Sequence, residues 1–183
     1  LEEVDDFVHT RGDKVMKTEY IPYTLELYKF VAESVCEGKE YLEELQNKLV
    51  EFISDDFDYK KLILSKYIDN DKLKEQIQHN KFTQPHMKLA HQHDKDTKLD
   101  LLYCYGTQST TSELMVMGVP TTKTSNTYMI FENDYKDEFL LDKMFYLEKH
   151  LKDHLIYASK DSKEVEELMV KMVERIKLQR GDV

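Results

Sequence analysis

The sequence predicts an α+β fold in which a helical N-terminal half precedes a small sheet with two long C-terminal helices. Apolar residues recur at helical spacing early in the chain and again near its end. Between these regions, residues 99–131 form the most apolar and least charged stretch and contain short aromatic runs typical of strands. A chain of 183 residues with 12 Tyr and 8 Phe can bury a substantial core.

The N-terminal half is predicted to begin with a helical hairpin. Pro22 suits a first helical turn, and Gly38 interrupts the helical period before it restarts. The periodic positions are Leu27, Tyr28, Val31 and Val35 before the glycine, and Leu42, Leu45, Leu49, Phe52 and Ile53 after it. Two helices joined by so short a connection are expected to lie antiparallel.

A third helix is predicted after the hairpin. Ser54, Asp55 and Asp56 are suitable N-cap residues. The apolar positions of this helix would be Ile63, Leu64, Tyr67 and Ile68. Asp69-Asn70-Asp71 would end it, with one short turn after the break.

The central stretch predicts a strand, a short capped helix, a polar loop and a second strand. The first strand covers residues 99–105 and is expected to be buried on both faces. Thr110 and Glu113 form a capping box for a helix over residues 111–117, which Gly118 would end with a positive φ. Residues 114–119 could instead form a strand. Residues 127–131 form the second strand.

The C-terminal part predicts a helix on Leu140, Met144, Leu147 and Leu151, followed by a further strand over residues 154–158. The last helix carries Val165, Met169, Met172 and Ile176 and is closed by Gly181. We expect one α+β domain over residues 1–183, made of a helical half (1–78), a histidine-rich loop (79–98) and a mixed α/β half (99–183). A chain that begins with Leu1 also fits a domain excised from a larger protein.

The formal net charge of −10 argues against nucleic-acid binding by the surface as a whole. A helix-turn-helix over residues 111–128 is disfavoured, because its recognition helix would hold Lys123 as its one cation. The sequence has no run of about 20 apolar residues and no secretory signal. Its two cysteines do not form a disulfide framework. We therefore expect a soluble, intracellular, cytoplasmic protein without a membrane partner.

Negative charge gathers on the predicted hairpin. Residues 33–58 hold nine acids and two lysines, a local net charge of −7. One interpretation is a solvated helix face, and the other is a docking surface for a protein with a basic surface. The acids that we expect to contact such a partner are Glu37, Glu40, Glu43, Glu44 and Glu51.

The histidine-rich loop holds the residues that could bind a metal. His91 and His93 would lie on one side of an extended segment, and His86 and Asp94 could complete a tetrahedral zinc site. The spacing matches no known metal motif, and lysines alternate with the histidines. We therefore expect no bound metal and no other cofactor.

Sequence motifs for catalysis are missing: there is no phosphate-binding glycine loop, no Gly-x-Ser-x-Gly and no Cys-x-x-Cys. Cys104 is a possible nucleophile, although no neighbour in the sequence activates it.

One stretch resembles a known enzyme family. Tyr105-Gly106, Ser109, Glu113-Leu114, Gly118-Val119 and Asn126 are similar to the closing part of SET-domain methyltransferases of the Rubisco-methyltransferase-like group. The resemblance covers about thirty residues and implies a catalytic role for Tyr105. The family binds the methyl donor with an Asn-His pair. This chain has only His79-Asn80, in the reverse order, and it lacks the glycine-bearing donor loop.

Taken together, these patterns favour a non-enzymatic protein-binding or regulatory domain, such as an inhibitor or immunity-type protein, that docks a basic partner through the acidic hairpin. The alternative is an enzyme: either a SET-like methyltransferase fragment using Tyr105, or a metal-dependent hydrolase using His86, His91 and His93.

Overall fold

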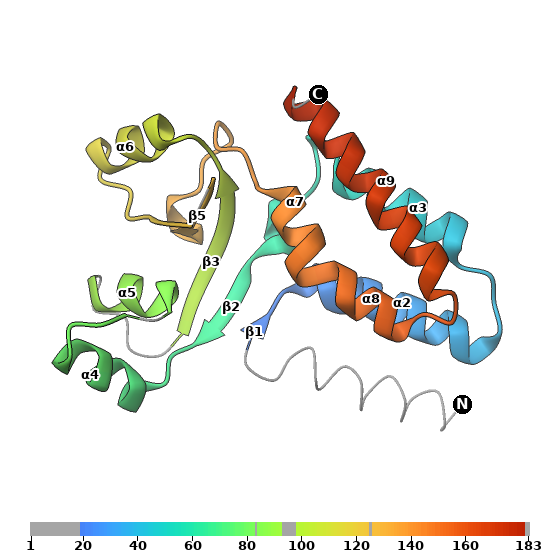
Figure 1. Ribbon diagram of the computed structural model, residues 1–183, viewed down its shortest axis with the longest axis horizontal. Coiled ribbons are helices and arrows are strands. Elements are labelled where there is room, and N and C mark those ends of the chain that lie inside the picture. Colours follow the sequence, from blue (N-terminus) through green and yellow to red (C-terminus); the bar gives the residue numbers. More distant parts are fainter. Residues whose placement is uncertain (1–18, 83, 93–97, 125, 182–183) are drawn as a thin grey trace. The chain divides into compact units, whose positions relative to one another are not determined.

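The structure, a computed structural model, describes residues 19–82, 84–92, 98–124 and 126–181. Its contacts divide the chain into two compact units. Among the described residues, the helical unit comprises 19–62 and 143–181, and the sheet unit comprises those between Ile63 and Asp142. Along the chain, helices both precede and follow an antiparallel sheet (Figure 1), which confirms the predicted α+β class.

In the helical unit, a two-residue strand β1 (Glu19–Tyr20) precedes α2 (Pro22–Glu37), which is followed by α3 (Leu42–Phe52) and the 3₁₀ turn η1 (Tyr59–Leu62). After the sheet unit, the chain continues with α7 (Lys143–Tyr146), a π-helical turn η3 (Leu147–Leu151), α8 (Lys152–Ala158) and α9 (Ser162–Arg180). Helix α2 packs on α8, and α3 packs on α9. The largest fully buried side chains here include Leu27, Tyr28, Leu45, Leu49, Phe52 and Tyr146.

The predicted hairpin is confirmed as α2 and α3. Pro22 occupies the first turn of α2, and Gly38 ends that helix with φ 67°. A left-handed residue at this position lets the next amides close the helix, and glycine adopts it without a Cβ clash. Accordingly, the amide of Lys39 donates to the carbonyl of Ser34 at 2.9 Å.

The strand predicted over residues 154–158 is wrong, because these residues form most of α8. Leu155 and Ala158 are buried and continue the apolar face of Leu147 and Leu151 at helical spacing. Packing of α8 against α2 outweighs the strand-like composition of the segment.

The sheet unit contains β2 (Leu64–Tyr67), α4 (Asn70–Gln78), α5 (Pro85–Gln92), β3 (Lys98–Tyr105), α6 (Gln108–Val116), β4 (Thr122–Thr124), β5 (Thr127–Phe131) and the 3₁₀ turn η2 (Glu132–Asp134). Its strands are antiparallel in the order β2-β3-β5-β4. Leu101 of β3 lies between Leu64 and Phe131 of the neighbouring strands. The predicted strands β3 and β5 are confirmed.

The third helix is not where the sequence predicted it. Residues 64–67 form strand β2, which pairs with β3, and the helix follows as α4. The Asp69 carboxylate accepts hydrogen bonds from the amides of Asp71 and Lys72, so the predicted helix stop is an N-cap. The apolar spacing fits a helix, but a strand buries Leu64 against β3.

Two other local predictions need correction. The histidine-rich loop contains α5, which packs on β4 and buries Met87, Leu89 and Ala90. Residues 93–97 of that predicted loop lie outside the described residues. The N-cap of α6 is Thr107, three residues before the predicted cap, because the Thr107 hydroxyl accepts from the amide of Thr110 at 3.3 Å. Gly118 follows α6 with φ 78°, as predicted.

Candidate functional site

The acidic hairpin, residues 33–58, exposes its carboxylates. Every acid in this range is solvent-exposed, including the five predicted contacts Glu37, Glu40, Glu43, Glu44 and Glu51. The apolar face of α3 points inward with Leu45, Leu49 and Phe52 buried. The structure thus places the predicted site residues on the surface of α2, the connection after it, and α3.

Some of these charges stabilise the helices that carry them, and others destabilise them. Glu43 and Glu44 lie in the first turn of α3, where negative charge complements the helix dipole. Glu37 and Glu51 lie in the last turns of α2 and α3, where negative charge opposes the dipole. Lys39 partly offsets Glu37 through an ion pair of 2.7 Å, which raises the pKa of Lys39. No such ion pair is described for Glu51.

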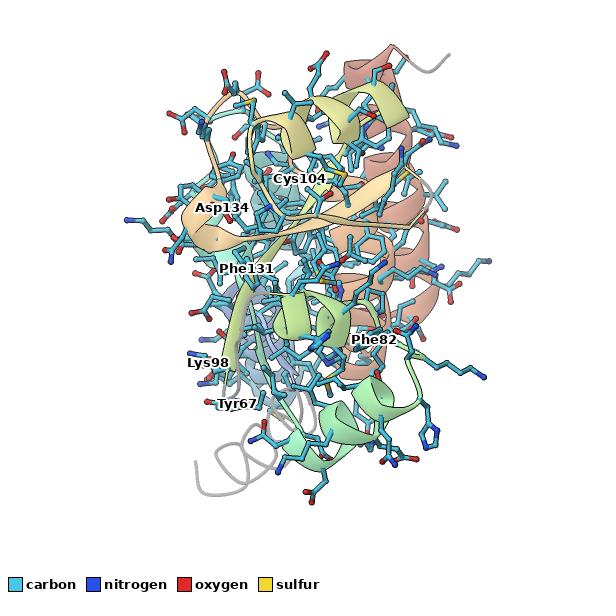
Figure 2. The ribbon with its side chains drawn as sticks, turned by 90° about the vertical axis from the view of Figure 1, so that its left-hand side faces the viewer. Tyr67, Phe82, Lys98, Cys104, Phe131 and Asp134 are labelled. Atoms are coloured by element: carbon cyan, nitrogen blue, oxygen red, sulfur yellow. The ribbon has the colours of Figure 1, made fainter. Side chains whose placement is uncertain are left out.

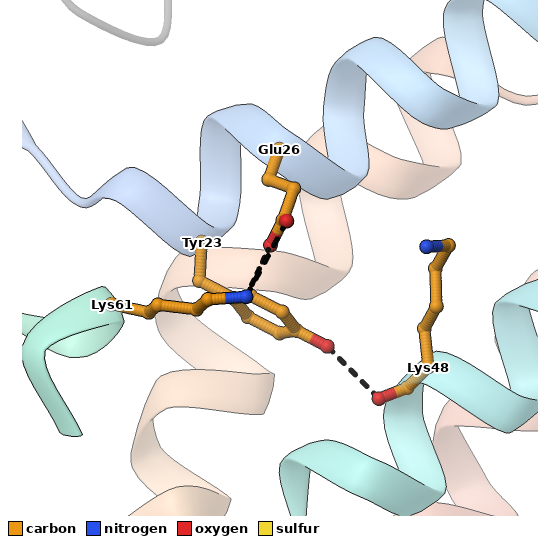
Figure 3. A network of polar contacts seen from close by, with 4 residues as sticks. All are labelled: Tyr23, Glu26, Lys48 and Lys61. Atoms are coloured by element: carbon orange, nitrogen blue, oxygen red, sulfur yellow. Dashed lines mark hydrogen bonds and ion pairs between the residues drawn. The ribbon is translucent and has the colours of Figure 1, made fainter. Parts of the chain in front are cut away.

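The Tyr23 side chain connects α2 to α3, the two helices of the acidic hairpin (Figure 3). Its hydroxyl donates to the Lys48 carbonyl at 2.9 Å, and its ring stacks on Phe52 with centroids 5.5 Å apart. Lys61 approaches the Glu26 carboxylate at 3.5 Å and thereby ties η1 to α2. Burial, with smaller contributions from Glu26 and Glu51, raises the pKa of the Tyr23 phenol, so the hydroxyl stays protonated and remains a donor.

The turn after α3 is also held in place. The Ser54 hydroxyl donates to the Asp56 carboxylate at 2.7 Å, which lowers the pKa of that carboxyl. The ammonium of Lys143 donates to the Ser54 carbonyl and lies 5.9 Å from the centre of the Phe52 ring. Burial lowers the pKa of Lys143, while Asp55 and Asp56 oppose that effect. The acidic hairpin is therefore presented on a fixed backbone.

The two candidate catalytic residues are core strand positions. Cys104 is fully buried and lies opposite Tyr128 in the β3–β5 register. Burial raises the pKa of its thiol to about 12, so it carries almost no thiolate near neutral pH. Tyr105 is half-buried, and its amide donates to the Leu140 carbonyl at 2.7 Å. The raised pKa of the Cys104 thiol does not fit an activated nucleophile.

Of the candidate zinc ligands, the structure describes His86 and His91, and it does not bring these two side chains together. His86 is buried in α5, whereas His91 is exposed and stacks on Phe82 with centroids 5.5 Å apart. Five residues along a helix turn the side chain by about 140°, so the two imidazoles point in different directions. His93 and Asp94 lie outside the described residues. The described part of the chain contains no group of three or more His, Cys, Asp or Glu side chains suited to a metal ion.

Sequence reasoning missed an exposed apolar surface on the sheet unit. Met115, Val116 and Met117 are 67%, 89% and 53% exposed, and we refer to them as the α6 apolar run. Four consecutive apolar residues begin at Leu114, and a helix can turn only part of such a run inward. Leu114 is the buried one. Exposed apolar runs of this kind are typical of contact surfaces.

An open cleft of about 510 Å³ lies on the sheet unit, lined by residues that include Lys98, Asp100, Phe131 and Asp134. Lys98, Phe131 and Asp134 follow one another along one side of the unit (Figure 2). The Asp100 carboxylate accepts from the Ser65 hydroxyl at 2.8 Å and lies 3.7 Å from the Lys98 ammonium. These partners hold Asp100 in place, and the cleft offers an acidic, polar rim.

No helix in the described ranges has the length and apolarity needed to cross a bilayer. The comparisons with known proteins give no identity either: no family model, no curated protein and no solved structure matches this chain. The resemblance to SET-domain methyltransferases therefore stays a prediction.

Proposed function

We propose that this chain is a non-enzymatic, cytoplasmic protein-binding domain of the regulatory or inhibitor type, which docks a partner with a basic surface through the acidic hairpin. The partner's lysines and arginines would contact Glu37, Glu40, Glu43, Glu44 and Glu51. Long-range attraction between a surface of this charge and a basic one speeds encounter and selects the partner.

The observation that carries the proposal is the placement of charge at the helix ends. Acids in a last helical turn cost stability, by about 0.3–1 kcal/mol each at exposed positions. Glu51 occupies such a position in α3, and Glu37 does so in α2. Helix stability does not account for these charges, whereas attraction of a basic partner does.

A charge-reversal experiment tests the proposal. The partner is first isolated by cross-linking to the wild-type chain, and its association rate is then measured at several salt concentrations. The hairpin variant Glu40→Lys/Glu43→Lys/Glu44→Lys is expected to associate about tenfold more slowly at low salt and to lose most of the salt dependence.

The matched control reverses three exposed acids of the sheet unit, Glu75→Lys/Asp137→Lys/Glu138→Lys. It changes the net charge by the same amount and is expected to keep most of the wild-type rate. Equal slowing in both variants would show that only the net charge matters, and an unchanged rate in the hairpin variant would exclude the hairpin as the docking surface.

A further inference from the structure

A groove of about 240 Å³ runs along α9 in the helical unit. One wall is formed by Leu147, Glu148 and Lys152, and the α9 wall includes Met169 and Glu174 together with the four residues considered next. Leu147 and Met169 are buried at its base. The groove therefore combines an apolar floor with charged rims, outside the acidic hairpin.

Four residues of α9 form a continuous stripe along this groove: Glu166, Val170, Val173 and Lys177. Their spacing of four, three and four residues keeps them on one side of the helix over about 16 Å. Val170 is 58% exposed and Val173 is half-buried. Valine is a weak helix former, so an exposed valine costs helix stability without burial to compensate for it.

The helix dipole explains part of the charge pattern but not the valines. Acids near the start of α9, such as Glu166, and bases near its end, such as Lys177, complement the dipole. The core face of α9 consists of other residues, among them Val165, Met172 and Ile176. The stripe is therefore a second apolar face that the helical unit itself leaves partly uncovered.

The order of the stripe is self-complementary. When a second α9 lies antiparallel across it, with the twofold axis between Lys171 and Met172, Val170 meets Val173 of the other copy. In the same register, Glu166 meets Lys177 of the other copy, and both contacts occur twice. A twofold interface requires this reciprocity, since each surface must fit itself.

We infer that the chain forms a homodimer in which the α9 stripes of two copies pack antiparallel. The two valine contacts form the apolar centre, and the two Glu166–Lys177 ion pairs fix direction and register. The next pair outward, Lys163 against Arg180, is like-charged and limits the contact to the four central positions. So short an interface predicts a weak dimer, with a dissociation constant in the micromolar to millimolar range.

Sedimentation equilibrium of the full chain tests the dimer at concentrations from about 10 μM to about 1 mM, which span this range. Wild type is expected to dimerise with increasing concentration and less strongly at high salt. Glu166→Lys and Lys177→Glu, each alone, are expected to weaken dimerisation at least about tenfold, because each change affects two ion pairs. The double variant Glu166→Lys/Lys177→Glu is expected to restore it.

Two further variants make the register testable. Lys163→Glu removes the outer repulsion and is expected to strengthen dimerisation. Glu167→Lys, an exposed reversal beside the stripe, serves as the matched control and is expected to leave dimerisation within about threefold of wild type. Far-UV circular dichroism verifies that each variant is folded.

A wild-type chain that stays monomeric at about 1 mM would overturn the inference, because the predicted dissociation constant falls below that concentration. A dimer that the double variant does not restore would overturn the antiparallel register. A monomer that is clearly destabilised by Val170→Ser, at the exposed valine of the stripe, would show that another part of the same chain covers the stripe, which also contradicts the inference.

Discussion

The Tyr23 hydroxyl donates a 2.9 Å hydrogen bond to the main-chain carbonyl of Lys48, 25 residues further along the chain. Tyr23 lies in the first turn of α2, and Lys48 lies in the second half of α3, so the bond links the start of one helix to the later part of the other. The acidic hairpin depends on this frame, because its exposed carboxylates are spread over both helices.

Tyr23→Phe removes this hydrogen bond and keeps the ring that stacks on Phe52. We expect a loss of about 0.5–1.5 kcal/mol in the free energy of unfolding, the usual net value of such a bond. Urea unfolding followed by circular dichroism measures it. Tyr67→Phe, at a side chain that is 67% exposed, is the control and should change stability by less than about 0.5 kcal/mol. Equal effects of the two changes would mean that the bond does not tie the helices.

Leu102 lies at the centre of the sheet unit, opposite Ile130, and is fully buried. Leu102→Ala is expected to cost about 2–5 kcal/mol, because it removes buried methyl groups and leaves a cavity. Leu178→Ala, at a position 66% exposed, is the matched control. Urea unfolding of both variants distinguishes the two environments, and a cost below about 0.5 kcal/mol for Leu102→Ala would place it outside the core.

The sequence correctly predicted those elements in which the apolar periodicity and the residues at the two ends indicate the same structure. Helix α2 has a proline at its start and a left-handed glycine after its end, and strand β5 matches its predicted range, residues 127–131. The errors fall where local pattern and tertiary pairing disagree. Residues 64–67 fit a helical spacing, but only the neighbouring strand β3 shows that they form β2.

The candidate functional residues were likewise predicted only in part. Local charge can be counted in the sequence, so the acidic hairpin was identified directly. The exposure of Val116 and of Val170 could not be predicted from the sequence, because it depends on which faces of α6 and α9 are covered by neighbours. A run of four apolar residues from Leu114 was the one available signal for the α6 surface.

The two cysteines are expected to differ in reactivity. Cys36 is exposed and Cys104 is buried. Iodoacetamide at about pH 8, below the ordinary thiol pKa, should therefore label one cysteine in the folded chain and both in urea, counted by mass spectrometry. Cys36→Ser should abolish native labelling, and rapid labelling of Cys104 in the folded chain would contradict its burial.

The same burial predicts a stability effect at high pH. Folding raises the pKa of the Cys104 thiol from 9.0 to about 12, so the folded state holds the proton more tightly than the unfolded chain. The resulting stability is fully present below about pH 9 and is lost as the pH rises toward 12. Cys104→Ala should show a smaller loss over this range in urea unfolding, and an equal loss would assign the effect to other groups.

Metal removal provides a further test. Because His86 is buried and His91 is exposed on the same helix, we expect no stoichiometric structural zinc. A chelator should leave the melting temperature unchanged within error, and elemental analysis should find well under one zinc per chain. One tightly bound zinc, lost together with stability in His91→Ala and His93→Ala, would reverse this prediction and favour the enzyme alternative.

The last prediction concerns the α6 apolar run. Met115→Gln/Val116→Lys/Met117→Gln replaces three exposed side chains, so the free energy of unfolding should change by less than about 0.5 kcal/mol. Binding of a hydrophobic dye to the folded chain should fall, because the variant lacks the apolar contact surface. Leu114→Ala, at the buried position beside the run, should instead cost about 2–5 kcal/mol. A loss above about 1 kcal/mol in the triple variant would show that these residues are covered in solution, since exposed positions rarely cost so much.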